Sequence, residues 1–201
     1  MIRLATVTFA GCLGLLTIAA CSGDGRALRP AGPSQTLSII TTTTAGAVTS
    51  GPALKPGGDG FAVTAPWSDG AVIDTQYTCR GTDISPPISW SGVPADAKEL
   101  ALTLVDVDAS DYAQWIVAGL DPASTGIAAG KVPAGAVQGV NGFGEAKYAG
   151  PCPPDGQHTY LLTLYALANR SNLADGVNAG TAINQLQSEQ LASAVVSGRF
   201  G

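Results

Sequence analysis

The chain has 201 residues, of which 45% are hydrophobic and only 12% are charged. That charged share is about half of the usual quarter, so the composition argues against an intrinsically disordered chain and predicts a buried core. Ten basic and fifteen acidic residues give a formal net charge of −5, and there is one histidine. This balance argues against nucleic-acid binding, and the lone histidine excludes metal sites built from several histidines.

The first segment, residues 1–20, is typical of a secretory signal. Arg3 supplies the basic start, and the uncharged stretch 4–20 that follows is short for a membrane-spanning helix. It ends in Ile-Ala-Ala-Cys, which resembles the lipobox of bacterial lipoproteins, and that resemblance implies acylation of Cys21. We therefore expect an anchor of acyl chains such as palmitate on Cys21, at the extracytoplasmic face of a bacterial cell membrane. An ordinary secretory signal with an incidental cysteine is the alternative.

The next segment, 21–50, has the composition of a tether between the anchor and a domain. It is rich in Gly, Ser and Pro and contains four consecutive threonines at 41–44. A flexible coil of this length spans roughly 30 Å on average. We expect the folded domain to occupy residues 51–201.

Strand signals dominate this domain, which also holds most of the 26 glycines and 13 prolines. Short apolar runs bounded by Gly, Pro and Asp predict strands at 61–64, 71–73 and 88–91. Longer apolar runs predict strands buried on both faces at 99–105, 115–120 and 160–168.

Only the last part of the chain has helical spacing. Ile183, Leu186, Leu191 and Val195 share one helical face, which predicts a helix over about 181–196. We expect Thr181 or Gly180 to cap its start and Gly198 to cap its end. The whole pattern predicts a mainly β domain, an antiparallel β-sandwich with short helices and a C-terminal helix.

Four cysteines occur in the chain, and two of them fall in the domain. Cys12 leaves with the signal and Cys21 carries the anchor, so Cys79 and Cys152 remain. Outside the cytosol, two remaining thiols favour a disulfide bond. Two free buried thiols are the alternative, whereas a zinc site is poorly supported because there is no C-x-x-C pair.

Three segments carry side chains that suit a binding site: 106–111 (DVDASD), 113–115 (AQW) and 150–160 (GPCPPDGQHTY). The first imitates the start of a calcium-binding loop, but Asp111 and Val117 stand where that loop needs glycine and glutamate. A solvated acidic turn is the better reading. A nucleophile elbow of the form G-x-S-x-G is absent from the sequence, so hydrolysis is hard to build.

Together and in this order, these segments resemble a known family. Residues 79–94 (CRGTDISPPISWSGVP), 104–109 (LVDVDA), 114–117 (QWIV) and 150–160 are similar to the motifs of phosphatidylethanolamine-binding proteins, in their bacterial Raf-kinase-inhibitor-like branch. The resemblance covers roughly residues 55–201. It implies a β-sandwich with a small pocket for phosphate-type head groups.

The pocket residues that the resemblance implies are Asp106, Pro151, His158 and Tyr160. His158 and the Tyr160 hydroxyl would donate to an anionic oxygen, and Asp106 would orient the imidazole. A histidine held in place at the start of a strand is the alternative for His158. No cofactor or metal is implied.

One departure from the family pattern bears on affinity. Gln114 stands where the family has a histidine, and an amide donates without bringing charge. Losing a charge-assisted hydrogen bond costs about 1.5–3 kcal/mol, roughly 10- to 150-fold in affinity. We still expect Gln114 to line the pocket of a non-enzymatic, membrane-anchored binding protein for a small anion or phospholipid head group. The alternative is a regulator, such as a protease or kinase inhibitor, that acts on an unknown protein partner through its surface.

Overall fold

A computed structural model describes residues 54–55, 60–110 and 112–201 of this chain. The signal segment 1–20, the anchor at Cys21 and the tether 21–50 lie outside the described residues, so those three remain predictions. The described residues after residue 60 form the β domain.

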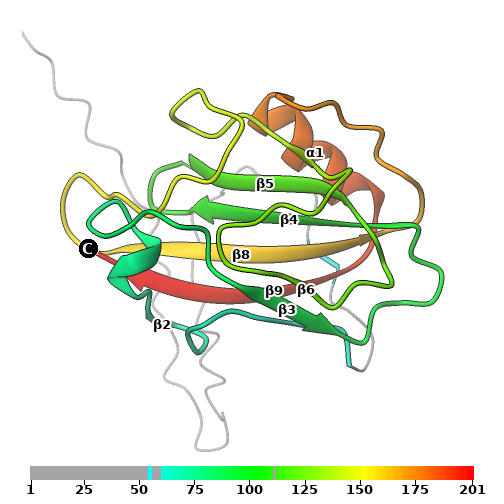
Figure 1. Ribbon diagram of the computed structural model, residues 1–201, viewed down its shortest axis with the longest axis horizontal. Helices are drawn as coiled ribbons and strands as arrows, with labels where there is room; N and C mark the ends of the chain where they lie inside the picture. Colours follow the sequence, from blue (N-terminus) through cyan, green and yellow to red (C-terminus); the bar gives the residue numbers. More distant parts are fainter. Residues whose placement is uncertain (1–53, 56–59, 111) are drawn as a thin grey trace, which may run out of the picture. The chain divides into compact units, whose positions relative to one another are not determined.

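A six-stranded sheet forms the centre of the domain (Figure 1). Its strand order is β2-β9-β8-β4-β5-β7, and its neighbours are antiparallel except for the parallel pair β2–β9. The strands are β2 (Ala71–Val72), β4 (Glu99–Asp106), β5 (Tyr112–Leu120), β7 (Val137–Gln138), β8 (His158–Leu167) and β9 (Gln190–Phe200). The sheets are thus antiparallel as predicted, apart from this one short parallel pair.

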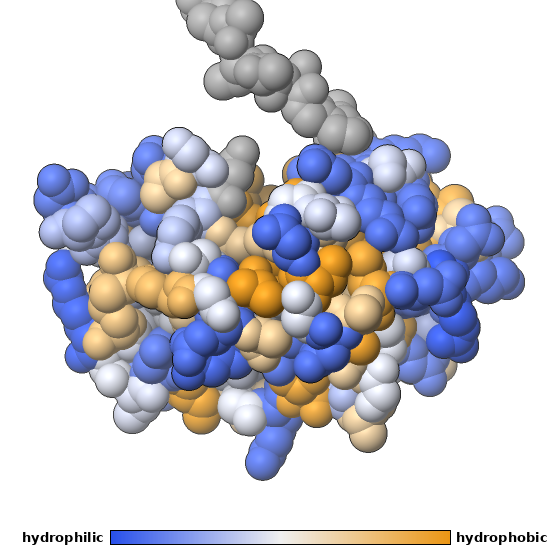
Figure 2. Space-filling model, turned by 90° about the horizontal axis from the view of Figure 1, so that it is seen from above, coloured by the Kyte–Doolittle hydropathy of each residue, from blue (hydrophilic) through white to orange (hydrophobic). Residues whose placement is uncertain are grey.

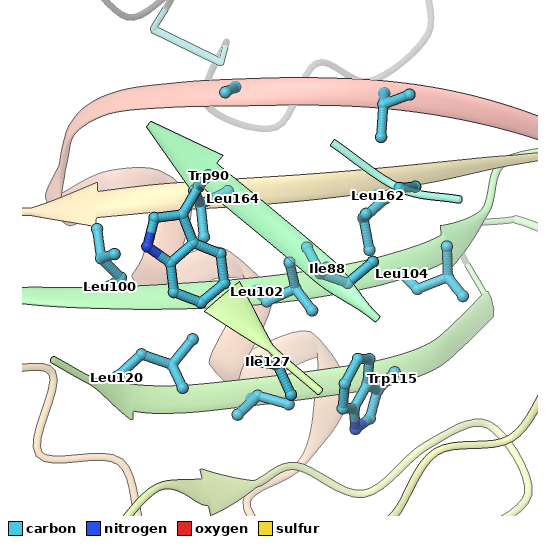
Figure 3. Packing of buried hydrophobic residues seen from close by; sticks show 14 of the residues in the cluster. Ile88, Trp90, Leu100, Leu102, Leu104, Trp115, Leu120, Ile127, Leu162 and Leu164 are labelled. Atoms are coloured by element: carbon cyan, nitrogen blue, oxygen red, sulfur yellow. The ribbon is translucent and has the colours of Figure 1, made fainter. Parts of the chain in front are cut away.

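A smaller sheet covers one face of the large one and closes the sandwich. It comprises β1 (Ala62–Thr64), β3 (Ile88–Ser91) and β6 (Gly126–Ile127), in the order β1-β3-β6. In β3, Ile88 and Trp90 point inward while the two serines face solvent, as the alternation predicts. These side chains meet the leucines of β4 and β8 in the main core (Figure 3).

The other face of the large sheet is covered by the helix α1 (Ala179–Glu189). Ala182 and Leu186 are fully buried there, against side chains of β4, β5 and β8. Because the sheet is covered on both faces, its central strands read as continuous apolar runs rather than as alternating ones. A short 3₁₀ turn, η1 (Thr75–Tyr77), follows β2.

The helix extends less far than the sequence predicts. It begins after Asn178, whose side chain accepts a hydrogen bond from the Thr181 N–H (3.3 Å), so neither Thr181 nor Gly180 is the cap. It ends at Glu189, and residues 190–200 form β9 instead of continuing the helix. The prediction of helix to residue 196 was wrong because pairing with β8 and β2 outweighs helical spacing.

Gly198 shows why this segment belongs in the sheet. It lies inside β9, opposite Tyr160 of β8 and Ala71 of β2. A Cβ there would lie 2.6 Å from Ile73 Cγ1 and 2.7 Å from Trp67 Nε1. The glycine therefore admits the close packing of neighbouring side chains and is not a helix cap.

The surface of the domain is mixed in polarity (Figure 2). On the face shown, hydrophobic residues gather near the middle and hydrophilic ones surround them. Six large hydrophobic side chains of the described residues are exposed: Val72, Ile84, Val107, Val132, Phe143 and Val195. In the described part of the chain, no helix has the length and apolar character needed to span a bilayer.

Candidate functional site

Asp106 and His158 meet at one end of the central sheet. Asp106 is the last residue of β4, and His158 is the first residue of the neighbouring strand β8. The His158 Nδ1 lies 2.8 Å from Asp106 Oδ2, with the two side chains 15% and 4% exposed. Such a contact fixes the orientation of the imidazole ring.

Tyr160 lies directly beside this pair, opposite Asp106 in the β4–β8 register. Its side chain is fully buried, and its hydroxyl has no hydrogen-bond partner among the described residues. Burial raises the pKa of Tyr160 above its ordinary range, and the charge of Asp106 raises it further. The hydroxyl therefore keeps its proton at neutral pH. The Asp106 carboxylate and the Cys152 backbone lie near it, but among the described residues neither completes a hydrogen bond of normal geometry with it.

A cavity of about 210 Å³ opens beside Asp106. Its walls are formed by Asp106, Ala109, Tyr112, Gln114, Phe143, Cys152 and Pro154. Two of the predicted pocket residues, Asp106 and Gln114, line it. Pro151, His158 and Tyr160 lie next to those walls in sequence or space but are not among the lining residues. Asp106 links the cavity to His158.

The Gln114 side chain is buried and turned toward the loop that precedes the cavity wall. With its amide nitrogen facing the loop, it donates to the carbonyl oxygens of Ala149 (2.8 Å) and Gly150 (3.2 Å). An amide NH₂ has two donors, so both are used by the backbone. The geometry thus favours a positioning role for Gln114 over direct donation to an anion.

The acidic segment after β4 forms a turn. The Asp108 N–H donates to Asp106 Oδ1 (3.0 Å), and Asp108 Oδ2 accepts from the Thr159 N–H (2.6 Å). Asp111 lies outside the described residues, among which no group of three or more His, Cys, Asp or Glu side chains could hold a metal ion. The turn instead fixes Asp106 against β8.

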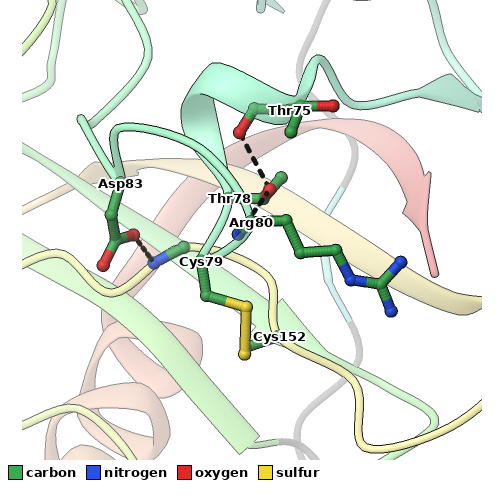
Figure 4. The surroundings of a disulfide bond; sticks show 7 residues. Thr75, Thr78, Cys79, Arg80, Asp83 and Cys152 are labelled. Carbon is green, nitrogen blue, oxygen red and sulfur yellow. Dashed lines mark hydrogen bonds between the residues drawn. A yellow bond between two sulfur atoms is a disulfide. The ribbon is translucent and has the colours of Figure 1, made fainter.

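Cys79 and Cys152 form a disulfide bond with their Cα atoms 5.4 Å apart (Figure 4). Two hydrogen bonds support the same junction. The Cys79 N–H donates to the Pro151 carbonyl (3.2 Å), and the Gly150 N–H donates to Asp83 Oδ1 (2.6 Å). Together they attach the proline-rich loop to the segment that follows η1, so that Cys152 stands in the cavity wall.

Two aromatic residues that the sequence analysis did not single out complete the cavity. The rings of Tyr112 and Phe143 meet edge to face at 5.4 Å. Phe143 is 55% exposed, and its loop is closed by Asn141 Oδ1, which accepts from the N–H groups of Phe143 and Glu145. Gly142 has no side chain to collide with the Tyr112 ring. An Asn-Gly-Phe-Gly turn that places an aromatic at its tip is the signal that could have indicated this wall.

A larger cavity, of about 440 Å³, lies away from this chemistry. Trp115, Gln138, Lys147, Tyr148 and the segment 82–85 contribute to its walls, together with Gly130 and Val132. It includes neither Asp106 nor His158, so its size alone does not make it the functional site.

A sandwich with a small cavity beside a buried Asp–His–Tyr group defines a class of ligand-binding domain, and comparisons with known proteins agree with it. The sequence model of the family described as "Phosphatidylethanolamine-binding protein" matches residues 63–201. This chain therefore belongs to the phosphatidylethanolamine-binding protein family.

Individual relatives extend this result. The "Putative lipoprotein LppC" of Mycobacterium tuberculosis is 39% identical over 189 residues, which cover 90% of each chain. A "UPF0098 protein" of Methanothermobacter thermautotrophicus is 39% identical over 144 residues, covering 68% of this chain and 95% of that protein. The solved structure of Escherichia coli YbcL, titled a new member of the mammalian family, superimposes with a TM-score of 0.64 at 30% identity, covering 70% of this chain and 97% of YbcL. The predicted mainly β fold of this family is thus confirmed.

Proposed function

We propose that this protein is a membrane-anchored, non-enzymatic binding protein whose cavity beside Asp106 holds a small anionic group, such as a phosphate or a phospholipid head group. The observation that carries the proposal is the Tyr160 hydroxyl, which is buried without a hydrogen-bond partner among the described residues. A buried donor left unpaired costs about 1–3 kcal/mol, so native proteins seldom keep one unless a ligand or water uses it.

The neighbouring groups suit an anion at this position. His158 is held by Asp106 through Nδ1, so Nε2 is the ring nitrogen that is available to a ligand, and it donates to an anion when both ring nitrogens are protonated. Both Asp106 oxygens already accept hydrogen bonds, from His158 and from the Asp108 N–H, which reduces their repulsion of an anion. An anionic oxygen could then accept from Tyr160 and His158 together.

The surroundings of His158 argue against catalysis. A hydrolytic site needs a nucleophile within hydrogen-bond reach of a general base, and among the described residues no serine, threonine or cysteine side chain hydrogen-bonds to His158, the only histidine of the chain. Tyr160 keeps its proton because burial raises its pKa, so it is a poor nucleophile at neutral pH. Binding is the function that this set of residues supports best.

The membrane anchor rests on the sequence around Cys21 and on the printed name of the relative LppC. Acylation there would place the domain at the extracytoplasmic face of the cell membrane, held by the tether 21–50. More than one acyl chain is needed for stable anchoring.

The test is native mass spectrometry of a soluble form that begins at Ser22, with phosphoethanolamine, inorganic phosphate and a short-chain phospholipid added in turn. We expect saturable binding by the natural chain, and its loss in His158→Ala and Tyr160→Phe. Tyr165→Phe is the matched control, because it removes a buried tyrosine hydroxyl from the same strand outside the cavity. Absence of binding by the natural chain at millimolar ligand would refute the proposal and favour a role exerted through the protein surface.

A further inference from the structure

The disulfide bond is part of the cavity wall and is also open to solvent. Cys152 lines the cavity beside Asp106, and its partner Cys79 lies on the segment after η1. Both cysteines are exposed. A thiolate from solution can therefore reach the bond that shapes the pocket, which is the condition for thiol–disulfide exchange.

The two halves of the loop 149–157 are attached to the domain by different contacts. Residues 149–151 form hydrogen bonds to the rest of the domain. The Gln114 amide donates to the carbonyls of Ala149 and Gly150. Asp83 accepts from the Gly150 N–H, and the Pro151 carbonyl accepts from the Cys79 N–H. In the stretch 152–157 of the described chain, the disulfide is the one covalent cross-link, and the buried Pro153 adds packing against the domain. Pro153 and Pro154 have no N–H to donate. The Cys79–Cys152 bond thus positions the second half of the loop together with the packing of Pro153.

This half of the loop matters for binding because of what it carries. Cys152 and Pro154 line the cavity, and His158 follows at the start of β8. Asp106, His158 and Tyr160 belong to paired strands, so they keep their places whether or not the bond exists. Opening the disulfide would release one wall of the cavity and leave the Asp106–His158–Tyr160 group in place.

We propose that the Cys79–Cys152 bond is a site of reversible thiol–disulfide exchange, and that its redox state sets the affinity of the cavity for its ligand. The proposal rests on the anion-binding function proposed above. The co-reactant is a dithiol. One of its thiolates attacks a sulfur of the pair and displaces the other cysteine as thiolate. The second thiol of the reductant then resolves the mixed disulfide, so that the protein gains two thiols while the dithiol becomes a disulfide.

The experiment compares oxidised, reduced and reoxidised chain, purified from the membrane in detergent micelles. Phosphoethanolamine binding is measured by calorimetry, and amide hydrogen exchange is followed at 152–157 and in the core of β8. Peptide mapping after alkylation identifies which cysteines react. The matched control is Cys79→Ser/Cys152→Ser, in which the reductant has no bond to open. Far-ultraviolet circular dichroism checks that both forms stay folded.

We expect reduction to weaken phosphoethanolamine binding about tenfold, to speed exchange at 152–157 but not in β8, and to be reversed by oxidation. The serine pair should bind like the reduced chain with or without reductant. Equal affinity of oxidised and reduced chain would overturn the redox proposal and leave the anion pocket standing. If neither the oxidised nor the reduced chain binds, the proposed function fails, and hydrogen exchange alone tests the effect of the disulfide. Unchanged exchange at 152–157 after reduction would then refute the link between the bond and the loop. Faster exchange confined to 152–157 would support release of the loop.

Discussion

Replacing Tyr160 by phenylalanine should change stability and ligand affinity in opposite directions. In the ligand-free chain the hydroxyl is buried and lacks a hydrogen-bond partner among the described residues, so it contributes an uncompensated desolvation cost. Removing an unpaired buried polar group relieves about 1 kcal/mol, because the ring itself stays in the same packing. For a domain of this size that corresponds to a rise in melting temperature of about 2–4 °C.

Ligand binding should suffer from the same change. A hydrogen bond to a charged acceptor contributes about 1.5–3 kcal/mol, so Tyr160→Phe is expected to weaken phosphoethanolamine binding roughly 10- to 150-fold. Calorimetry gives the affinity and thermal unfolding without ligand gives the stability, with Tyr165→Phe as the control outside the cavity. A fall in ligand-free stability of more than about 1 kcal/mol would show that the hydroxyl already has a partner, and the reasoning for an anion at this place would fail.

Three further predictions follow from the packing, the cross-link and the buried tyrosines. Cys79→Ser/Cys152→Ser opens a loop of 73 residues and should lower the free energy of unfolding in urea by about 4 kcal/mol on the chain-entropy view; a loss below about 1 kcal/mol would contradict it. Gly198→Ala should lower the free energy of unfolding by about 1–3 kcal/mol because the new methyl group overpacks against Ile73 and Trp67. Gly180→Ala, in the exposed first turn of α1, should raise the free energy of unfolding by about 0.5–1 kcal/mol. Equal effects of the two changes in thermal unfolding would refute the packing argument. Burial raises the pKa of Tyr148, Tyr160 and Tyr165 above the ordinary 10.0, so these hydroxyls lose their protons at a lower pH in the unfolded chain than in the folded one. The stability that these groups contribute is therefore present below the ordinary pKa of 10.0 and should be lost as the pH rises above that value. Urea titrations at increasing pH should show this loss, reduced in Tyr160→Phe, and a flat profile would count against it.

The strands could be predicted where local pattern and final environment agree. The alternating residues 88–91 form β3, which faces solvent on one side. The apolar run 99–105 forms β4, which is covered on both faces. The prediction of a helix over 190–196 was wrong because Leu191 and Val195 fit the helical spacing of α1 although they belong to β9. Val195 is in fact 42% exposed in β9, and only the long-range pairing with β8 and β2 determines that outcome.

The grouping of Asp106, His158 and Tyr160 could be predicted, but the walls of the neighbouring cavity could not. Asp106, His158 and Tyr160 are brought together as the family motifs imply, since the register of β4 and β8 places them side by side. The role of Gln114 depends on where the loop 149–151 runs, and the approach of Phe143 to Tyr112 depends on a tight turn far along the chain. Neither contact is encoded in the spacing of residues near the motif.

The position of β9 has a consequence for how the chain folds. This strand comes last in the domain but lies between β8 and β2, pairing Ala71 with Gly198 across most of the domain's length. Such distant pairings make folding slow and late. The central sheet therefore stays open along β8 until residue 200 has been synthesised and is free to pair. A chain with this order of assembly does not complete its fold while its last strand is withheld, which fits the export that residues 1–20 predict.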